Sequence, residues 1–184
     1  MKIIMMGPQG CGKSTQAALL SKKFNIPHLS SGDIFRSLEK SDTALGKRVW
    51  QVLSLGKLVS DEDTMLVIKE ELSKKEYNQG FILDGFPRNL YQADNAPFEP
   101  DLVLYLKVPK AVSFERLIAR KREDDTEEVI KTRLSEYYKN TAPVLDYYEN
   151  KGILRTFNGE QGIDVIHKKL VKEIETALKA DAAK

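Results

Sequence analysis

The chain has 184 residues, of which 41% are hydrophobic and 30% are charged, and its formal net charge is +2 at pH 7. A chain of this size and composition can fold as one globular domain with a full hydrophobic core, which excludes an intrinsically disordered protein. The near balance of charge gives no support to a nucleic acid or a membrane surface as partner, so any positively charged site must be local.

The chain opens with a short apolar strand and a glycine-rich loop. The predicted strand, IIMM at 3–6, runs into GPQGCGKST at 7–15, which fits the phosphate-binding pattern G-x-x-x-x-G-K-[ST] and precedes an amphipathic helix. The backbone N–H groups of such a loop form an anion nest at the start of the helix. We predict that Lys13 binds the outer phosphates and that a hydroxyl of Ser14 or Thr15 faces Mg²⁺.

The same segment excludes several other classes. Its apolar run is too short for a signal peptide, and no other run reaches the length of a membrane span, so we expect a cytoplasmic protein. The single cysteine, Cys11, excludes an intrachain disulfide and a cysteine zinc cluster. We expect Cys11 to fill space in the loop, although the neighbouring Lys13 could lower the pKa of its thiol and make it reactive.

Strand-like and helix-like segments alternate along the rest of the chain. Further strands are predicted at 26–30, 81–84, 102–108 and 153–157. The alternation predicts an α/β fold of the P-loop NTPase type, with about five parallel strands and helices on both faces. Residues 30–59 carry short helical segments and no strand, so we expect a small flap inserted into a single domain that spans 1–184.

The C-terminal half contains a long helical stretch and no obvious catalytic histidine. The apolar spacing predicts a helix from about 126 to 149, kinked at Pro143, with Asp125 as a cap at its start. His28 and His167 have no acid or nucleophile at catalytic spacing, and we interpret both as structural.

The stretch GFILDGFPRN at 80–89 carries the second candidate site. Its strand is expected to lie beside the strand at 3–6, so that both end at the edge where α/β sheets bind ligands. There Asp84 can hold Mg²⁺ or its waters, and Arg88, on a turn stiffened by Pro87, can bind a phosphate with both guanidinium nitrogens. A carboxylate and a guanidinium suit phosphoryl transfer, although a structural Asp–Arg pair that closes a turn has the same sequence pattern.

Five segments together resemble the adenylate kinase family. In chain order they are GPQGCGKSTQA, LSSGDIFR, GKLVSDE, LDGFPRNLYQA and DDTEEVIKTRLSEYYKNTAPVLDYY, and the resemblance covers nearly all of the chain. It implies transfer of the γ-phosphoryl group of MgATP to AMP, giving two ADP, with Mg²⁺ as cofactor. It also implies that the flap at 30–59 binds the nucleoside monophosphate. The sequence leaves open whether the protein is a monomer or a small homo-oligomer.

The resemblance also implies which residues bind AMP, which bind ATP and which are catalytic. The AMP-binding residues that it implies are Ser31, Gly32, Arg36, Lys57, Leu58, Val59, Gly85, Phe86, Pro87, Arg88, Gln92, Arg122 and Arg133. The implied ATP-binding residues are Gly10, Cys11, Gly12, Lys13, Ser14, Thr15, Arg116, Arg120 and Gln161. The implied catalytic residues are Lys13, Asp84, Arg88, Arg120, Arg122 and Arg133, with Mg²⁺ held through Ser14, Thr15 and Asp84, partly by way of water, and no zinc.

Gln92 bears on the choice of acceptor. By resemblance its amide reads the adenine edge, and an amide can donate and accept at once, which suits N1 and the 6-amino group. Related pyrimidine kinases usually have Asn near that position and Ala in place of Ser31, so Gln92 favours AMP over UMP or CMP. Two alternatives stay open: a kinase of another nucleoside monophosphate, and a nucleotide sensor that binds ATP and AMP without useful turnover.

The sequence departs from the family pattern in two places. In the phosphate loop, Gln9 replaces the usual proline and Ser14 the usual glycine, and both fit the generic pattern. Long family members insert a lid of several dozen residues after Arg120, whereas here only Lys121 separates Arg120 from Arg122, so the lid insertion is essentially absent. We expect either slower turnover with some phosphate lost to water, or shielding of the phosphates by another element or subunit.

Overall fold

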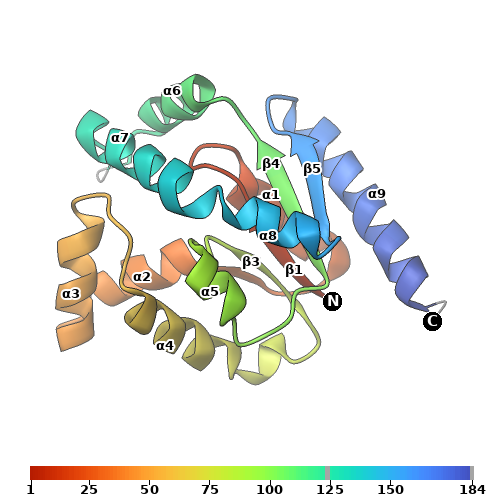
Figure 1. Cartoon of the computed structure of the whole chain (residues 1–184), viewed down its shortest axis with the longest axis horizontal. Coiled ribbons are helices and arrows are strands. Elements are labelled where there is room, and N and C mark those ends of the chain that lie inside the picture. The colour runs from red at the N-terminus through yellow and green to blue at the C-terminus, as the bar shows by residue number, and fades with distance from the viewer. Residues whose placement is uncertain (123–124, 183–184) are drawn as a thin grey trace.

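The structure, a computed structural model, describes residues 1–122 and 125–182 and is built around one parallel sheet. Its strands are β1 (Lys2–Met6), β2 (His28–Ser30), β3 (Phe81–Asp84), β4 (Leu102–Lys107) and β5 (Leu154–Asn158). They pair in the order β2-β3-β1-β4-β5, and every pair is parallel (Figure 1). Each strand overlaps one predicted from the sequence, so the predicted α/β fold is confirmed.

Helices cover both faces of this sheet (Figure 1). One face packs against α1 (Lys13–Phe24) and α9 (Ile163–Ala182). The other face packs against α4 (Asp61–Leu72), α5 (Leu90–Asp94) and α8 (Val144–Asn150). Beyond the carboxyl ends of the strands lie α2 (Ser31–Glu39), α3 (Ala44–Leu53), α6 (Lys110–Arg120) and α7 (Glu127–Glu136). Two short turns complete the described elements, η1 (Lys75–Tyr77) and the π-helical η2 (Tyr137–Thr141).

The side chains of β1 explain why both faces need a cover. Ile3 and Met5 pack toward α1 and α9, whereas Ile4 and Met6 pack toward α8. All four are at most 3% exposed, as expected for a central strand of a parallel sheet. Burial of side chains of this size contributes about 1.5–3 kcal/mol each, so this core holds β1 firmly in the middle of the sheet.

The pairing of β1 with β3 positions the two candidate sites. Met5 lies opposite Asp84 in the register, which confirms that the strand at 81–84 lies beside the strand before the glycine-rich loop. After β1 the chain continues to β2, which lies on one side of the β3–β1 pair. After β3 it continues to β4, which lies on the other side of that pair. Such a reversal leaves a crevice at the carboxyl ends of the two strands, where open α/β sheets bind ligands.

The flap, residues 30–59, is helical as predicted, with α2 and α3 and no strand between 31 and 59. It has a small core of its own, in which Phe35 and Val49 pack with Val67 of α4. Arg48 of α3 pairs with Asp63 of α4 at 2.7 Å. The flap is therefore tied to α4.

The long helix predicted for 126–149 is instead three consecutive pieces, α7, η2 and α8. Pro143 stands directly before α8, and the wider π-helical turn η2 precedes it, because proline has no N–H to continue a regular ladder. The cap of α7 is Thr126, whose hydroxyl accepts from the Val129 N–H at 3.3 Å, so the prediction of Asp125 as cap is wrong. The carboxylate of Asp125 bonds two arginines instead.

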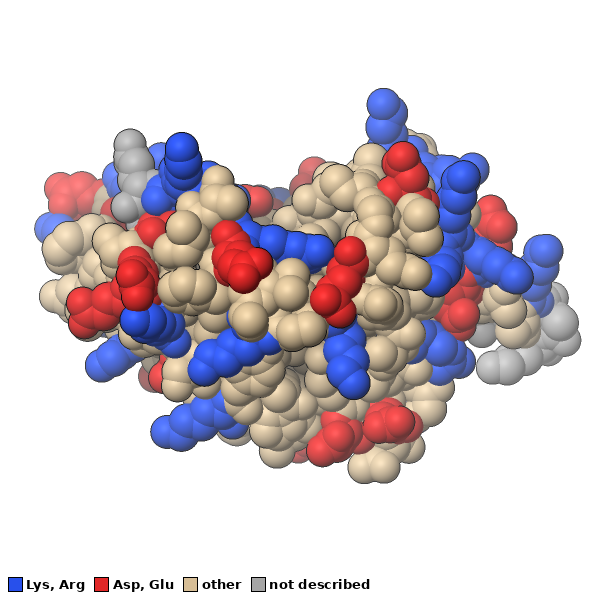
Figure 2. Space-filling model, turned by 90° about the horizontal axis from the view of Figure 1, so that it is seen from above, with Lys and Arg blue, Asp and Glu red and all other residues tan. Residues whose placement is uncertain are grey.

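None of the described helices is long and apolar enough to cross a membrane. On the face seen from above in Figure 2, lysine and arginine side chains stand among aspartates and glutamates. This mixed surface is what the small net charge of the sequence leads us to expect.

Candidate active site

A cleft of about 690 Å³ opens at the carboxyl ends of β1 and β3. Its walls are the glycine-rich loop, the turn after β3, the flap, α6 and α7. The predicted site residues that line it are Gly10, Gly12, Lys13, Ser14, Thr15, Ser31, Gly32, Arg36, Lys57, Leu58, Val59, Asp84, Gly85, Arg88, Gln92, Arg116, Arg120, Arg122 and Arg133. Residues from distant parts of the sequence thus share one cavity, as the motifs predict.

The glycine-rich loop ends in an exposed helix start. Gly12 stands at the N-terminal cap of α1 with φ +94°, in the left-handed region that favours glycine. The helix has neither a side-chain cap nor an acidic residue in its first turn. Its first N–H groups are therefore available to an anion, and the ammonium group of Lys13 lies in the same wall, 3.3 Å from the Pro8 carbonyl.

Asp84 presents an ionised carboxylate to this cleft. Its side chain is only 5% exposed, and it accepts a hydrogen bond from His28 Nε2 at 2.8 Å. Burial raises the pKa of the Asp84 carboxyl, but the His28 hydrogen bond and the charge of Lys13 outweigh it, and the net pKa is below its ordinary value. Asp84 is therefore negatively charged at neutral pH.

The contact with Asp84 revises the interpretation of His28. His28 is the first residue of β2, and in the parallel pairing of β2 with β3 it lies opposite Ile82. Asp84 lies opposite Ser30, two positions further along both strands. A contact between residues 56 apart in the sequence depends on strand register, and spacing along the chain carries no signal of it. His28 thus contacts a residue of the cleft without lining the cleft itself, and the sequence did not predict this contact.

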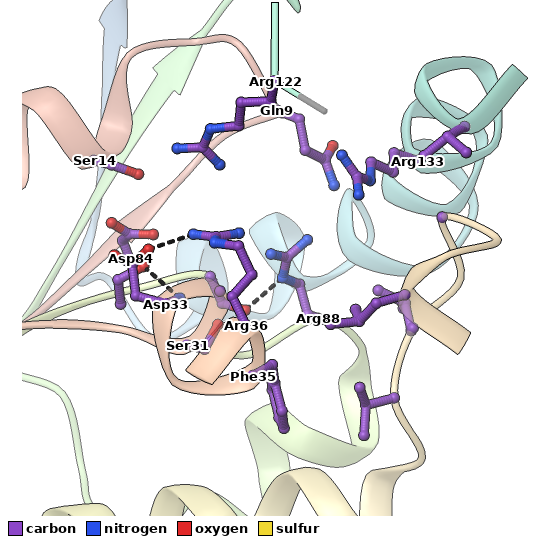
Figure 3. A pocket seen from close by; sticks show the side chains of 18 of the residues that line it. Gln9, Ser14, Ser31, Asp33, Phe35, Arg36, Asp84, Arg88, Arg122 and Arg133 are labelled. Atoms are coloured by element: carbon purple, nitrogen blue, oxygen red, sulfur yellow. Dashed lines mark hydrogen bonds and ion pairs between the residues drawn. The ribbon is translucent and has the colours of Figure 1, made fainter. Parts of the chain in front are cut away.

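Several arginines converge on the space in front of Ser14 and Asp84. Arg36, Arg88, Arg122 and Arg133 surround this space from the flap, the β3–α5 turn and the α6–α7 region (Figure 3). Burial lowers the pKa of Arg88, and the charges of Arg133 and Arg36 add to this effect, while Asp84 opposes it. Cations held this close repel one another, so the arrangement favours a bound anion with several charges.

Two of the cationic side chains share a buried acid. The Asp125 side chain is 1% exposed and accepts from Arg120 Nε at 2.8 Å, from Arg120 Nη2 at 2.9 Å and from Arg133 Nη1 at 2.7 Å. Because Arg120 ends α6 and Arg133 lies in α7, this carboxylate fixes the two helices and their guanidinium groups relative to each other. The sequence predicted Asp125 only as a cap.

The cleft wall also has apolar side chains and contains Gln92. The apolar side chains include Phe35, Leu53 and Val59 of the flap. Gln92 is 1% exposed, donates from Nε2 to Asp61 Oδ1 at 2.7 Å and accepts at Oε1 from the Arg88 N–H at 2.7 Å. One N–H and one oxygen lone pair of the amide remain for a ligand.

Comparison with known proteins agrees with this geometry. The family model described as adenylate kinase matches residues 5–153. The chain belongs to the adenylate kinase family. It is 45% identical over 173 residues to an adenylate kinase of Cyanothece sp., covering 87% of this chain and 88% of that protein. It is 43% identical over 188 residues to an adenylate kinase of Bifidobacterium longum, covering 95% and 100%.

A longer relative differs in the number of residues. The adenylate kinase of Acetivibrio thermocellus is 34% identical over 212 residues, covering 95% of this chain and 98% of that protein. Since 95% of 184 residues is about 175, the alignment holds about 37 positions (212 less 175) at which this chain has no residue. In the structure, α6 ends at Arg120 and α7 begins at Glu127, so only residues 121–126 connect them.

Four of the residues that the adenylate kinase resemblance implies have side chains away from the cleft. Phe86 is 1% exposed in the core and Pro87, after a cis peptide bond, is buried behind the site. The Gln161 side chain accepts at Oε1 from Lys169 at 2.9 Å, but the role that the resemblance implies for Gln161 belongs to its backbone carbonyl and not to this side chain. Cys11 is 1% exposed, and burial raises the pKa of its thiol more than Lys13 lowers it, which favours the predicted space-filling role over a reactive thiol.

Other residues line the cleft without having been predicted as part of the site. They are Gln9, Ser30, Asp33, Phe35, Glu39, Trp50, Leu53, Ser54, Gly56, Thr64, Thr126 and Val129. Gln9, noticed in the sequence only as a departure from the adenylate kinase pattern, points into the cleft (Figure 3). Its Oε1 is buried without a hydrogen-bond partner among the described residues. The unpredicted residues of the flap include Phe35, Trp50 and Leu53, which lie in helices. Their spacing in the sequence indicates a helix, but it does not tell which face of that helix lines a cleft.

Proposed function

We propose that this member of the adenylate kinase family is an ATP:AMP phosphotransferase, which transfers the γ-phosphoryl group of MgATP to AMP and gives two ADP. The observation that carries the proposal is the convergence on one cleft of an anion-binding helix start, the ionised Asp84 and a set of arginines. The amide of Gln92 lines the same cleft. The cleft therefore has room and chemistry for two nucleotides whose phosphates meet in the middle.

In this proposal the chain works by alignment and charge neutralisation. The start of α1 and Lys13 hold the donor phosphates, while Arg36 and Arg88 hold the acceptor phosphate. Arg120, Arg122 and Arg133 neutralise the charge that spreads over the transferring group. No general base is required, because the phosphate oxygen of AMP that attacks is already anionic.

We assign the Mg²⁺ of MgATP to the region of Ser14, Thr15 and Asp84. Asp84 is ionised, and Ser14 and Thr15 line the same cleft. Mg²⁺ takes few protein ligands and keeps several waters, so one carboxylate and one hydroxyl fit its needs beside a nucleotide. When bound, the ion supplies positive charge at the outer phosphates of ATP.

We further propose that the flap shields the phosphates in place of a lid. Gly56 of the flap, with φ +71°, lies so close to α7 that a Cβ atom there would be 2.8 Å from the Val129 carbonyl oxygen. Trp50, 58% exposed, and Leu53 line the cleft from the same flap. These contacts favour shielding by another element of the chain over loss of phosphate to water.

A coupled assay with MgATP and a panel of AMP, dAMP, CMP, UMP and GMP tests the proposed activity. We expect AMP and dAMP to be phosphorylated, and the pyrimidine nucleotides to react with kcat/KM lower by a factor on the order of 10², because they leave the Gln92 amide unpaired. Turnover with a pyrimidine nucleotide alone would make the protein a different nucleoside monophosphate kinase. Calorimetric binding of ATP and AMP without turnover would make it a sensor.

A further inference from the structure

We propose that Asp61 is a positioning residue that sets the purine specificity of the acceptor site. By holding the Gln92 amide in one orientation, Asp61 makes the site accept a 6-aminopurine nucleoside monophosphate and reject a 6-oxopurine one. The inference rests on the proposed function, because it concerns the acceptor nucleotide of that site.

Asp61, Asn89 and Gln92 are all linked to one another by hydrogen bonds. Asp61 is the first residue of α4, two positions after the end of the flap, and its Oδ1 accepts from Gln92 Nε2 at 2.7 Å and from Asn89 Nδ2 at 2.7 Å. Asn89 in turn accepts at Oδ1 from the Gln92 backbone N–H at 2.8 Å. A single carboxylate oxygen thus anchors both the amide of Asn89, the N-cap of α5, and the amide of Gln92 within α5.

These contacts leave only one orientation of the amide that pairs correctly. A glutamine amide has nearly the same shape when its oxygen and nitrogen are exchanged, so shape alone does not select between the two. In the observed orientation, Nε2 faces the Asp61 carboxylate and Oε1 faces the Arg88 N–H. The exchanged orientation would place an oxygen against the carboxylate and an NH₂ against an N–H donor, inside a side chain that is 1% exposed. Both hydrogen bonds would then be lost in a buried place.

A fixed amide distinguishes the two kinds of purine. The adenine edge has an acceptor at N1 and a donor at its 6-amino group, which match the remaining N–H and oxygen lone pair of Gln92. A 6-oxopurine presents the reverse, a donor at N1 and an acceptor at O6. Gln92 could serve that edge only by exchanging its oxygen and nitrogen, and both Asp61 and the Arg88 N–H oppose the exchange. The specificity therefore depends on a residue 31 positions away from Gln92 in the sequence.

Asp61 also lies in the first turn of α4, where any acid stabilises a helix. A matched control separates the two roles. Glu62, next in the same turn, is exposed, so Glu62→Gln removes a charge from the helix start without touching the Gln92 amide.

The test compares AMP with IMP, which differs from AMP only at this edge of the base. For the wild type we expect kcat/KM to favour AMP over IMP by a factor on the order of 10³ or more. In Asp61→Asn, whose side chain can offer either an oxygen or an NH₂ to Gln92, we expect that ratio to fall at least tenfold, through a higher KM for AMP and a lower KM for IMP. In Glu62→Gln we expect the ratio to stay within about twofold of the wild type, because no contact to the amide changes.

A uniform loss of kcat/KM for both nucleotides in Asp61→Asn, with the ratio unchanged, would overturn the proposal and leave Asp61 a purely structural role. Asp61→Ser keeps a residue suited to a helix start and removes the carboxylate, so it gives the same test if Asp61→Asn does not fold. Calorimetric dissociation constants for AMP and IMP extend the comparison to binding. Failure of the wild type to turn over AMP would refute the proposed function, whereas an unchanged AMP-to-IMP binding ratio in the variants would refute this inference alone.

Discussion

Arg88→Ala lowers kcat/KM for AMP by about 10³-fold, the largest loss we expect from any single substitution in the cleft. Three hydrogen bonds hold Arg88 in place. Its Nε donates to the Gly85 carbonyl oxygen, its backbone N–H donates to Gln92 Oε1 at 2.7 Å, and its backbone carbonyl accepts from Thr141 Oγ1 at 2.7 Å. The rest of the guanidinium faces the cleft, where the acceptor phosphate and the transferring group would lie (Figure 3). Steady-state kinetics with AMP as the varied substrate measure the effect.

Two further variants make the Arg88 result specific. Arg88→Lys keeps a positive charge but loses the planar pair of donors, so we expect a loss of about 10- to 100-fold. Arg155→Ala removes an exposed arginine of β5 that pairs with Glu173 at 2.8 Å, away from the cleft, and we expect less than a twofold change. Arg88→Ala with an unchanged melting temperature and kcat/KM within threefold of the wild type would show that Arg88 does not contact the reacting phosphates.

Asp125→Ala is the second substitution from which we expect a large effect, on both activity and stability. It leaves Arg120 and Arg133 close together without the buried carboxylate that separates their charges. Removal of one partner from a buried ion pair costs about 3–5 kcal/mol, and we expect about 2–3 kcal/mol here because Arg120 is partly exposed. Misplacement of the two guanidinium groups should also lower kcat by about 10²-fold.

Denaturant unfolding and kinetics measured on the same preparation separate the two effects of Asp125→Ala. Asp42→Ala is the matched control, because Asp42 also pairs with a cation, Lys47 at 2.8 Å, but its side chain is 92% exposed. For that variant we expect both quantities to stay near the wild type. A stable Asp125→Ala protein with normal kcat would mean that the arginines find their places without the shared acid.

The sheet was predictable because its strands carry local signals. In β1 and β3 an apolar run ends at a glycine-containing turn, and this pattern is visible without any knowledge of neighbours. The start of α7 was not predictable from local rules, since Asp125 and Thr126 are both good caps. Asp125 is taken by two arginines that the fold brings to it, which leaves the capping role to Thr126.

In the candidate site, too, some features could be predicted from the sequence and others depend on contacts that only the fold creates. Lys13, Asp84 and Arg88 could be placed together because the carboxyl ends of parallel strands meet at one edge. The contacts of His28 and Asp61 could not be predicted, because they depend on strand register and on how the flap returns to the sheet. For Cys11, the sequence shows the nearby Lys13 but not the burial that dominates the pKa of the thiol.

We expect this cleft to pass the γ-phosphoryl group to AMP and not to water. The most direct test follows the label of γ-³²P-ATP in the presence of Mg²⁺, with and without AMP, by separating nucleotides from inorganic phosphate. We predict that with AMP the label appears in ADP, and that release of labelled phosphate without AMP is on the order of 1% of that rate, because the flap shields the site. Labelled phosphate formed at the same rate with and without AMP, and no labelled ADP, would show that the protein hydrolyses ATP and does not phosphorylate AMP.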